Sequence, residues 1–151
     1  MIILMISSLK KNELKYYYKV YDEDVAFNSL KCTDGRYDLT HNLENIVDIK
    51  LNIPFSEIKE YYNSHDLFIL PARDEPAGIS ILEALSCGLA VICSTTCGNQ
   101  YYIEQGLNGH IFKCEVLDDL IEKIETCIND TEKLSKMKEN SFFYSKKTIT
   151  G

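Results

Sequence analysis

Short apolar runs alternate along this chain with segments whose apolar residues recur at helical spacing. Unbroken apolar runs suit strands that are buried on both faces of a parallel sheet. They lie at residues 2–7, 67–70 and 89–93, and two further strands are predicted at 46–51 and 110–112. Helices are predicted at 11–22, from Ser56 to Tyr62, at 79–87, at 117–129 and at 131–140. This alternation predicts an α/β fold with a Rossmann-like, doubly wound parallel sheet.

The segments between these elements are polar or rich in turn residues. A short strand is predicted at 25–27, and loops at 31–45, 71–78 and 94–99. Gly88 favours the end of the helix at 79–87, and Asn108-Gly109 is a strong signal for a tight turn. Residues 141–151 show no clear pattern. We therefore expect one domain over 1–140 and a tail over 141–151.

Length and charge narrow the class of protein. The chain has 151 residues, 45% of them hydrophobic, which suits one soluble domain. Its net charge is −7, and its only arginines are Arg36 and Arg73, so a nucleic-acid partner is not expected. No segment approaches the roughly 20 apolar residues of a membrane span. Residues 2–7 lack a preceding basic segment, which favours a buried strand over a signal peptide. We therefore expect a cytoplasmic protein.

The cysteines and histidines do not suggest a metal site. The six cysteines form no CxxC pair, and the three histidines are not grouped near them. We expect reduced, buried thiols and no metal. The cysteines are Cys32, Cys87, Cys93, Cys97, Cys114 and Cys127.

The loop at 71–78 is the best candidate for a ligand site. It leaves a strand and enters a helix, and ligands of doubly wound sheets bind at the carboxyl ends of strands. Gly78 allows close approach of a ligand, and the amides of Ile79 and Ser80 are free donors at the helix start, where a phosphate would bind. Asp74 and Glu75 would repel phosphate but would accept hydrogen bonds from sugar hydroxyls.

Glu83 extends this candidate site along the helix. It follows Ile79 by four residues and so lies on the same side as the helix start. A phosphate flanked by two hydroxyl-rich groups, as in a nucleotide sugar, would meet Glu75, the helix start and Glu83. The alternative is that Glu83 is one exposed residue of a surface helix. The next loop, with Gly98, would line the same cleft or form an ordinary turn.

Other polar and aromatic residues are expected to be structural. His65 is predicted at the end of a helix, where it interacts with the helix dipole, and His110 follows a turn. Cys97 has no evident base, so it is not expected to be a nucleophile. Tyr101 and Tyr102 are expected to pack, with stacking on a nucleobase as the alternative.

One segment carries a family resemblance. Residues 62–92 pass from a YxxxD-like start through a strand ending in Pro, then E-P-A-G, E-A-L-S-C-G and another apolar strand. This segment closely resembles the signature of family 4 retaining glycosyltransferases, which have the GT-B fold of two Rossmann-like domains facing a cleft. Seven residues separate Glu75 from Glu83, as in the family motif. The match covers roughly residues 46–130 and implies the carboxyl-terminal half of such an enzyme.

The resemblance implies a role for each matched residue. Glu75 would contact the donor sugar as the catalytic residue, and Glu83 would bind the ribose hydroxyls. The backbone near Ala77, Gly78 and Ile79 would approach the sugar and the diphosphate, and the Ser80 amide would bind the diphosphate. Gly98, from the next loop, is added as a further donor-binding position on the strength of its place in the chain and not of the resemblance.

The implied reaction is retaining, metal-independent transfer without a cofactor. The donor would be a UDP-, GDP- or ADP-linked sugar, and the acceptor a glycan or a lipid-linked glycan in envelope polysaccharide biosynthesis. The full enzyme would be cytoplasmic, or peripheral at the inner face of the membrane.

Two features of the family pattern are missing. No Arg-x-x-x-x-Lys segment is present to hold the diphosphate, and the acceptor-binding domain is absent. Residues 2–9 are either the first strand, with Lys10 or Lys11 as a poor substitute, or the second strand followed by a helix at 11–22. We favour the second alignment and a truncated amino-terminus. A non-catalytic nucleotide-sugar-binding or interaction module is therefore the alternative function, and an epimerase or phosphorylase relative is a weaker one.

Overall fold

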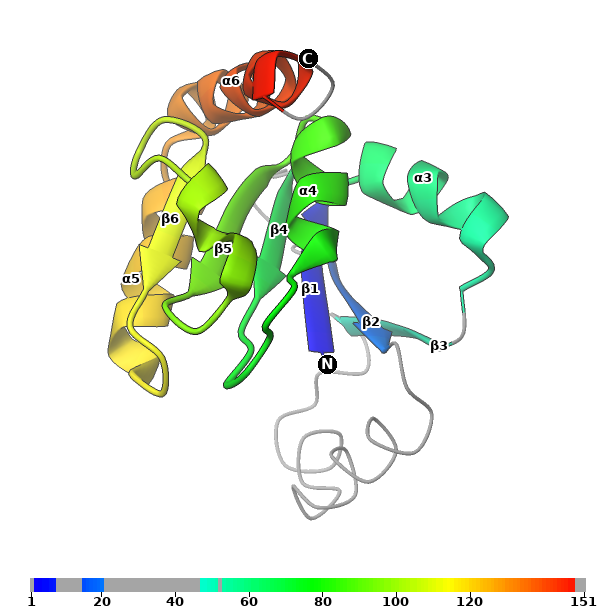
Figure 1. Cartoon of the computed structure of the whole chain (residues 1–151), viewed down its shortest axis with the longest axis horizontal. Coiled ribbons are helices and arrows are strands. Elements are labelled where there is room, and N and C mark those ends of the chain that lie inside the picture. The colour runs from blue at the N-terminus through cyan, green and yellow to red at the C-terminus, as the bar shows by residue number, and fades with distance from the viewer. Residues whose placement is uncertain (1, 8–14, 21–46, 52, 149–151) are drawn as a thin grey trace.

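The computed structural model describes residues 2–7, 15–20, 47–51 and 53–148. The six described strands form one sheet in the order β3-β2-β1-β4-β5-β6 (Figure 1). This is the strand order of a Rossmann-like doubly wound sheet, so the predicted fold class is confirmed. The strands are β1 (Ile2–Ser7), β2 (Lys15–Val20), β3 (Val47–Leu51), β4 (Leu67–Leu70), β5 (Ala90–Ser94) and β6 (Gly109–Phe112).

The direction of β1 differs from the expected parallel sheet. β4, β5 and β6 are parallel, and β2 is parallel to β3, but β1 is antiparallel to both β2 and β4. Residues 8–14 connect β1 to β2, and so few residues allow a hairpin but not the crossover that parallel neighbours need. Because Ile6 pairs with Leu67, Ser7 lies at the amino-terminal edge of β4. The end of β1 is therefore at the edge opposite the loops that follow β4 and β5.

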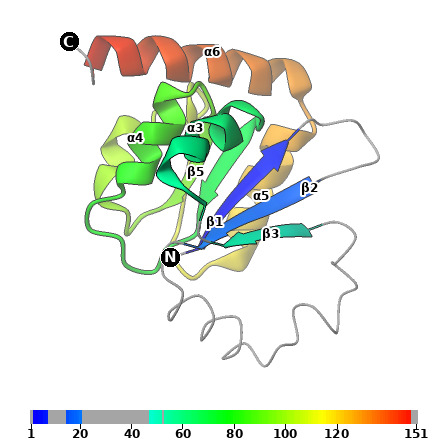
Figure 2. The ribbon, with the colours of Figure 1, turned by 90° about the vertical axis from the view of Figure 1, so that its right-hand side faces the viewer.

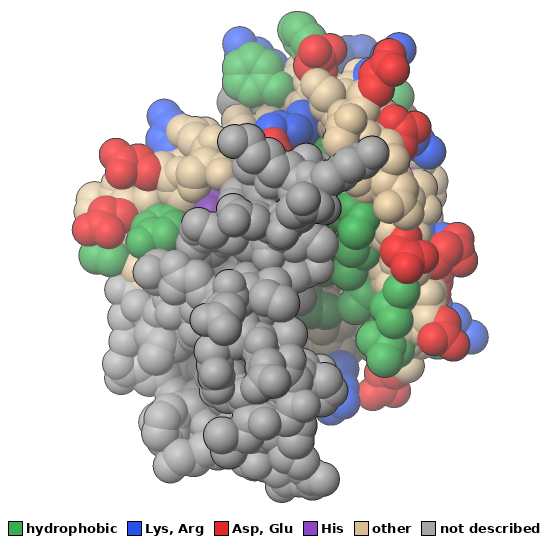
Figure 3. All heavy atoms as spheres, turned by 180° about the vertical axis from the view of Figure 1, so that it is seen from behind, with side chains coloured by type: hydrophobic (Ala, Val, Ile, Leu, Met, Phe, Trp, Pro, Cys, Tyr) green, Lys and Arg blue, Asp and Glu red, His purple; other side chains and the backbone are tan. Residues whose placement is uncertain are grey.

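Helices cover the sheet on both faces (Figure 2). On one face lie α3 (Phe55–Asn63) and α4 (Ile79–Ser86), with the short 3-10 helix η2 (Gly98–Tyr102) beside α4. On the other lies α5 (Leu117–Ile128), and α6 (Thr131–Thr148) crosses the end of the sheet opposite the 71–78 loop. Seen from behind (Figure 3), hydrophobic side chains lie between acidic ones on the α5 side, where Leu117 and Ile121 are exposed.

Two apolar clusters explain the unbroken apolar runs in the sequence. In β4, Phe68 and Leu70 pack into the cluster under α3 and α4, whereas Leu67 and Ile69 pack into the cluster under α5 and α6. β5 alternates in the same way. Every residue of both strands is buried, because each strand has a helical layer on either side.

The predicted helix at 11–22 is wrong where the structure describes it. Residues Lys15–Val20 form β2, which pairs with β1 on one side and β3 on the other. The run of tyrosines at 16–18 and Val20 has high β propensity, and pairing with two strands outweighs the weak helical spacing. This finding also contradicts the helix on which the favoured alignment depended. β1 instead occupies the central place of the first strand, with its direction reversed.

Most other elements agree with the predictions, with shifted ends. α3 begins after Pro54, which is its N-cap, so Ser56 does not cap it. α6 continues to Thr148, through eight residues for which no pattern was expected. Its buried face there consists of Ser141 and Ser145, whose hydroxyls bond to backbone carbonyls at 2.9–3.2 Å. Buried serines satisfied in this way leave no apolar periodicity in the sequence.

Asn108 and Gly109 are not the centre of a tight turn. The turn spans residues 106–108 and so is centred just before the pair, with Gly106 at φ +76° and the Leu107 amide bonded to the Glu104 carbonyl at 3.0 Å. The buried Asn108 side chain holds this turn by accepting from the Glu104 amide and donating to the Tyr102 carbonyl. Gly109 already belongs to β6, where a Cβ would lie 2.0 Å from the Val91 oxygen. Its role is close approach between strands.

The predicted strand at 25–27, the loop at 31–45, Cys32 and the lysines at 10 and 11 lie outside the described residues. Within the described part of the chain, no helix combines the length and apolar character needed to cross a bilayer.

Candidate functional site

Three loops meet at the carboxyl ends of β4, β5 and β6. The Ala72 carbonyl after β4 accepts hydrogen bonds from Ser94 Oγ at 2.5 Å and from Thr96 Oγ1 at 2.9 Å. Thr95 Oγ1 in turn accepts from the amide of Cys114 after β6 at 3.2 Å. The hydroxyls predicted to line the cleft at 94–99 thus tie the loops to one another. They fix the position of the 71–78 loop.

Gly98 lies directly against the 71–78 loop. Its amide donates to the Glu75 carbonyl at 2.8 Å. A Cβ on Gly98 would lie 1.7 Å from the Pro76 oxygen, so no larger residue fits without moving backbone. The structure therefore brings Gly98 and Glu75 together, as the shared-cleft interpretation of this loop requires.

The Glu75 side chain turns back onto its own loop. Its Oε1 accepts a hydrogen bond from the Gly78 amide at 3.0 Å. Gly78 is the N-cap of α4 and has φ +56°, a left-handed conformation that favours glycine. Glu75 thus satisfies one donor at this helix start, an interaction that the sequence did not reveal.

The start of α4 keeps the donor character that the sequence predicted. The first amides of a helix have no intrahelical acceptor, and here those of Ile79 and Ser80 follow the Gly78 N-cap. The Ser80 side chain is buried, and its Oγ has no hydrogen-bond partner among the described residues. Ile79 and Ala77 are exposed beside it. The four predicted positions thus adjoin at the helix start, with Ala77 and Ile79 exposed and Gly78 and Ser80 buried.

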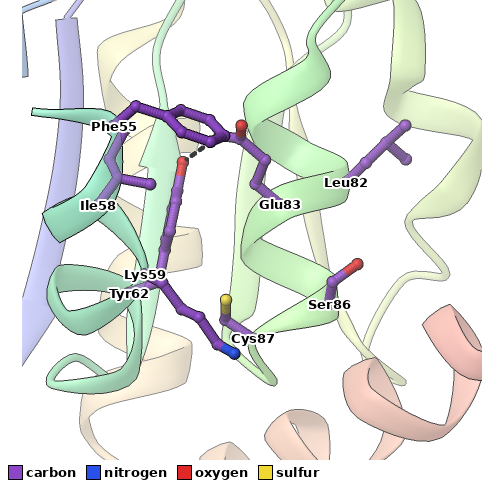
Figure 4. A pocket seen from close by; sticks show the side chains of 8 residues that line it. All are labelled: Phe55, Ile58, Lys59, Tyr62, Leu82, Glu83, Ser86 and Cys87. Carbon is purple, nitrogen blue, oxygen red and sulfur yellow. Dashed lines mark hydrogen bonds between the residues drawn. The ribbon is translucent and has the colours of Figure 1, made fainter.

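Glu83 is held by a tyrosine from the neighbouring helix. The hydroxyl of Tyr62 on α3 donates to Glu83 Oε2 at 2.9 Å (Figure 4). Tyr62 is 1% exposed, and Glu83 is half-buried. Glu83 is therefore half-buried and hydrogen-bonded, and not a freely solvated residue of a surface helix.

A pocket of about 320 Å³ lies between α3 and α4. Figure 4 shows Phe55 and Ile58 on the α3 side, facing Glu83 of α4. The α3 wall was not identified as part of a site from the sequence, although Ile58 and Tyr62 lie four residues apart on one helix face. The lining residues are Phe55, Ile58, Lys59, Tyr62, Leu82, Glu83, Ser86 and Cys87.

The predicted site residues thus divide into two neighbouring groups. Glu75, Gly78 and Gly98 contact one another at the loop ends, whereas Glu83 lines the pocket between the helices. α4 connects the two groups, since it starts beside Glu75 and carries Glu83 in its second turn.

Cations are sparse around these groups. Arg73 lies on the 71–78 loop, but its Nε is 3.3 Å from Glu115 Oε1 and both side chains are exposed. Lys59 lines the pocket. Among the described residues, no three His, Cys, Asp or Glu side chains are grouped as metal ligands would be.

Two thiols beneath the loops, Cys93 and Cys97, are buried, whereas Cys114 is half-buried. A hydrogen bond from the Cys93 thiol lowers the pKa of Cys97 to about 6, and Ser94 contributes in the same direction. The same bond and burial raise the pKa of Cys93. Cys97 is fully buried beneath the Glu75 loop, which agrees with a supporting role and not with that of a nucleophile.

The two described histidines are structural, as predicted. His65 follows α3, and its Nδ1 bonds to the Tyr61 carbonyl of the last turn. His110 lies in β6 with its Nδ1 3.0 Å from Gln105 Oε1. Burial lowers the pKa of both imidazoles, and two nearby lysines add to this for His110.

Comparison with known proteins identifies the family. Residues 2–142 match the family model of the glycosyl transferases group 1. The chain belongs to this family. It is 31% identical over 115 residues to the lipopolysaccharide glucosyltransferase WaaG of Escherichia coli, a match that covers 69% of the chain and 30% of WaaG. It is 28% identical over 134 residues to the uncharacterized glycosyltransferase MJ1178 of Methanocaldococcus jannaschii, covering 83% of the chain and 37% of the relative.

Solved structures agree with this assignment. Anabaena Alr3699/HepE in complex with UDP superposes with a TM-score of 0.69 at 26% identity, over 85% of this chain and 34% of that one. The C-terminal domain of the group 1 protein LpcC from Francisella tularensis superposes with a TM-score of 0.72 at 19% identity, over 80% of this chain and 63% of that one. The predicted Rossmann-like fold of the GT-B type is thereby confirmed. The chain spans roughly a third of WaaG and of MJ1178.

Proposed function

We propose that this domain binds a nucleotide-sugar donor at the start of α4 and in the pocket between α3 and α4. The observation that carries the proposal is the Glu83 carboxylate, held by Tyr62 at the wall of a pocket of about 320 Å³. That volume lies within the range of small-molecule sites. The relative HepE has been solved with UDP and with UDP-glucose, which supports this ligand class.

Each residue has a role in this proposal. Glu83 accepts hydrogen bonds from the ribose hydroxyls, and the exposed Phe55 offers a flat apolar surface for the base. The amides of Ile79 and Ser80 face the diphosphate at the positive end of the helix dipole. Glu75 meets the sugar, once the donor displaces its carboxylate from the Gly78 amide. Gly98 keeps the loop in place.

The reaction proposed for the complete enzyme is retaining sugar transfer without a metal. Helix-end amides stabilise the leaving diphosphate in place of a cation. The acceptor, a glycan or lipid-linked glycan, is held by a separate amino-terminal domain. Relatives such as the lipopolysaccharide glucosyltransferase WaaG support envelope polysaccharide biosynthesis as the setting. The configuration of the transferred sugar, determined by NMR, tests retention, and an inverted product would refute it.

Calorimetric titration tests donor binding directly. UDP, GDP and ADP, with their sugar conjugates, are titrated into the chain and into Glu83→Ala. We expect the best nucleotide to bind Glu83→Ala about 10- to 100-fold more weakly, because hydrogen bonds to a charged group contribute about 1.5–3 kcal/mol. Glu125→Ala on the exposed face of α5 is the matched control and should bind like the unaltered chain. Equal affinity of Glu83→Ala would remove Glu83 from the site.

A second candidate is a non-catalytic nucleotide-sugar-binding module. The reversed β1 favours it, because β1 ends, at Ser7, at the edge of the sheet away from the start of α4. No Arg–Lys pair then supports the diphosphate from that strand. Assays of donor hydrolysis and transfer, with and without a candidate acceptor-domain chain, separate the two functions. Turnover in either mixture supports the enzyme, and binding without turnover supports the module.

We further propose a cytoplasmic protein that associates peripherally with the inner membrane face. The last turns of α6 support an anionic lipid surface as the partner. Phe142 and Phe143 are exposed there, Lys146 and Lys147 follow, and hydrophobic and basic side chains adjoin at this end of the molecule (Figure 3). We expect the chain to sediment with phosphatidylglycerol vesicles. Phe143→Ser and Lys147→Glu should each weaken this binding. Equal binding to neutral phosphatidylcholine vesicles would contradict it.

A further inference from the structure

Tyr62 has a buried ring whose hydroxyl is bonded to Glu83, the carboxylate of the proposed ribose site. Its ring is 1% exposed and lies 5.8 Å from the Phe68 ring of β4, so the hydroxyl has little freedom of position. The Tyr62 hydroxyl reaches Glu83 Oε2 at 2.9 Å across the gap between the two helices. Figure 4 shows this bond inside the pocket, with Phe55 beside it.

This bond fixes the Glu83 side chain before any ligand arrives. A free glutamate loses rotamer freedom when it binds a ligand, and a side chain that is already held avoids much of that loss. Because Tyr62 occupies Oε2, the remaining lone pairs of the carboxylate are available to two neighbouring hydroxyl donors. A vicinal diol, as in ribose, matches that arrangement.

We propose that Tyr62 is a positioning residue that sets Glu83 for the 2′ and 3′ hydroxyls of the donor's ribose. The proposal rests on the donor site described above and adds a specificity to it. The site discriminates ribonucleotides from nucleotides that lack these hydroxyls, and the discrimination depends on a residue of α3 that does not itself touch the ribose.

The test compares two forms of the same nucleotide. UDP and 2′,3′-dideoxy-UDP, with the GDP and ADP pairs in parallel, are titrated into the unaltered chain and into Tyr62→Phe, which keeps the ring and its packing. For the nucleotide that binds, we expect Tyr62→Phe to lose about 5- to 10-fold in affinity for the ribose form. Its affinity for the dideoxy form should change by less than about twofold. A purely structural role would weaken both forms equally, and that result overturns the proposal.

Tyr61→Phe is the matched control. It lies next along α3, is half-buried, and makes no side-chain hydrogen bond to Glu83 among the described residues, so both affinities should stay unchanged. A similar loss of discrimination in Tyr61→Phe would overturn the assignment to Tyr62.

A ligand-free measurement separates this inference from the proposed function. Urea midpoints are compared for Tyr62→Phe, Glu83→Ala and the double variant. If Tyr62 holds Glu83, the double variant loses less stability than the sum of the losses in the two single variants. Additive losses overturn the coupling. Failure of the unaltered chain to bind any nucleotide refutes the donor site, whereas the urea cycle still decides whether Tyr62 positions Glu83.

Discussion

At the scale of single residues, the loop beside α4 depends on contacts that leave no room for a side chain. The amide of Gly98 bonds to the Glu75 carbonyl at 2.8 Å, and its α-carbon lies against the Pro76 carbonyl. The Glu75 carboxylate closes the loop from the other side through the Gly78 amide. The position of Glu75 therefore depends on a residue of the next βα loop.

Gly98→Ala is expected to disturb this loop. The added Cβ would lie 1.7 Å from the Pro76 oxygen, so one backbone segment must move. We expect a loss of about 1–3 kcal/mol in the free energy of unfolding, as for other overpacked sites. Urea denaturation measures it, and donor titration should show weaker binding as well. An unchanged urea midpoint and affinity would mean that the loop yields without effect on Glu75.

At the scale of elements, β5 and β6 approach closely at Gly109, whereas the turn that precedes β6 has space around its glycine. A Cβ at Gly109 would lie 2.0 Å from the Val91 oxygen. Gly106, in the turn, has φ +76° but nothing within 4 Å of a Cβ. The two glycines are therefore required for different physical reasons, one for space and one for backbone conformation.

Substituting each glycine by alanine separates these reasons. Gly106→Ala should lower the free energy of unfolding by about 1 kcal/mol, the usual penalty of a left-handed non-glycine residue. Gly109→Ala should lower it by about 3 kcal/mol or more, because the β5–β6 ladder must open. Thermal unfolding of both variants measures the difference. Equal losses would show that strand contact does not limit this position.

At the scale of the whole molecule, buried histidines make stability depend on pH. Burial lowers the pKa of His65 beside α3, and burial with Lys133 and Lys123 lowers the pKa of His110 in β6. The unfolded chain therefore takes up these protons at higher pH than the folded one. The contribution to stability is complete above about pH 6.5 and is lost as the pH falls below that value.

We expect the free energy of unfolding to fall between about pH 7.5 and about pH 5.5. Each histidine contributes at most about 1.4 kcal/mol per pH unit. Urea unfolding at both pH values measures this slope, and His110→Gln, which keeps a polar side chain near Gln105, should reduce it. Identical slopes would show that His110 does not contribute.

The sequence predicted the elements that carry the strongest patterns. The fully apolar runs at β4 and β5 and the helix of α4 lie where expected, because packing on both faces demands such runs. β2 was missed, since its tyrosines and lysines take their conformation from two neighbouring strands. The last turns of α6 were missed because Ser141 and Ser145, which are polar, form the buried face.

The candidate site was predictable where its residues are close in sequence. The loop with Glu75, the glycine at the helix start and Glu83 belong to one continuous motif, so α4 alone sets the spacing between its start and Glu83. Tyr62 and Phe55 belong to the preceding helix, so their approach to Glu83 depends on how α3 packs against α4. No local spacing encodes that contact.

By itself the sequence determined the fold class and the strand–loop–helix unit at 67–86, because these follow from periodicity and from residues near one another in the chain. The tertiary structure alone decided the reversed direction of β1, the hold of Tyr62 on Glu83 and the contact of Gly98 with the Glu75 loop. Each of these joins segments that are distant in sequence, and such contacts are set by packing of the whole domain.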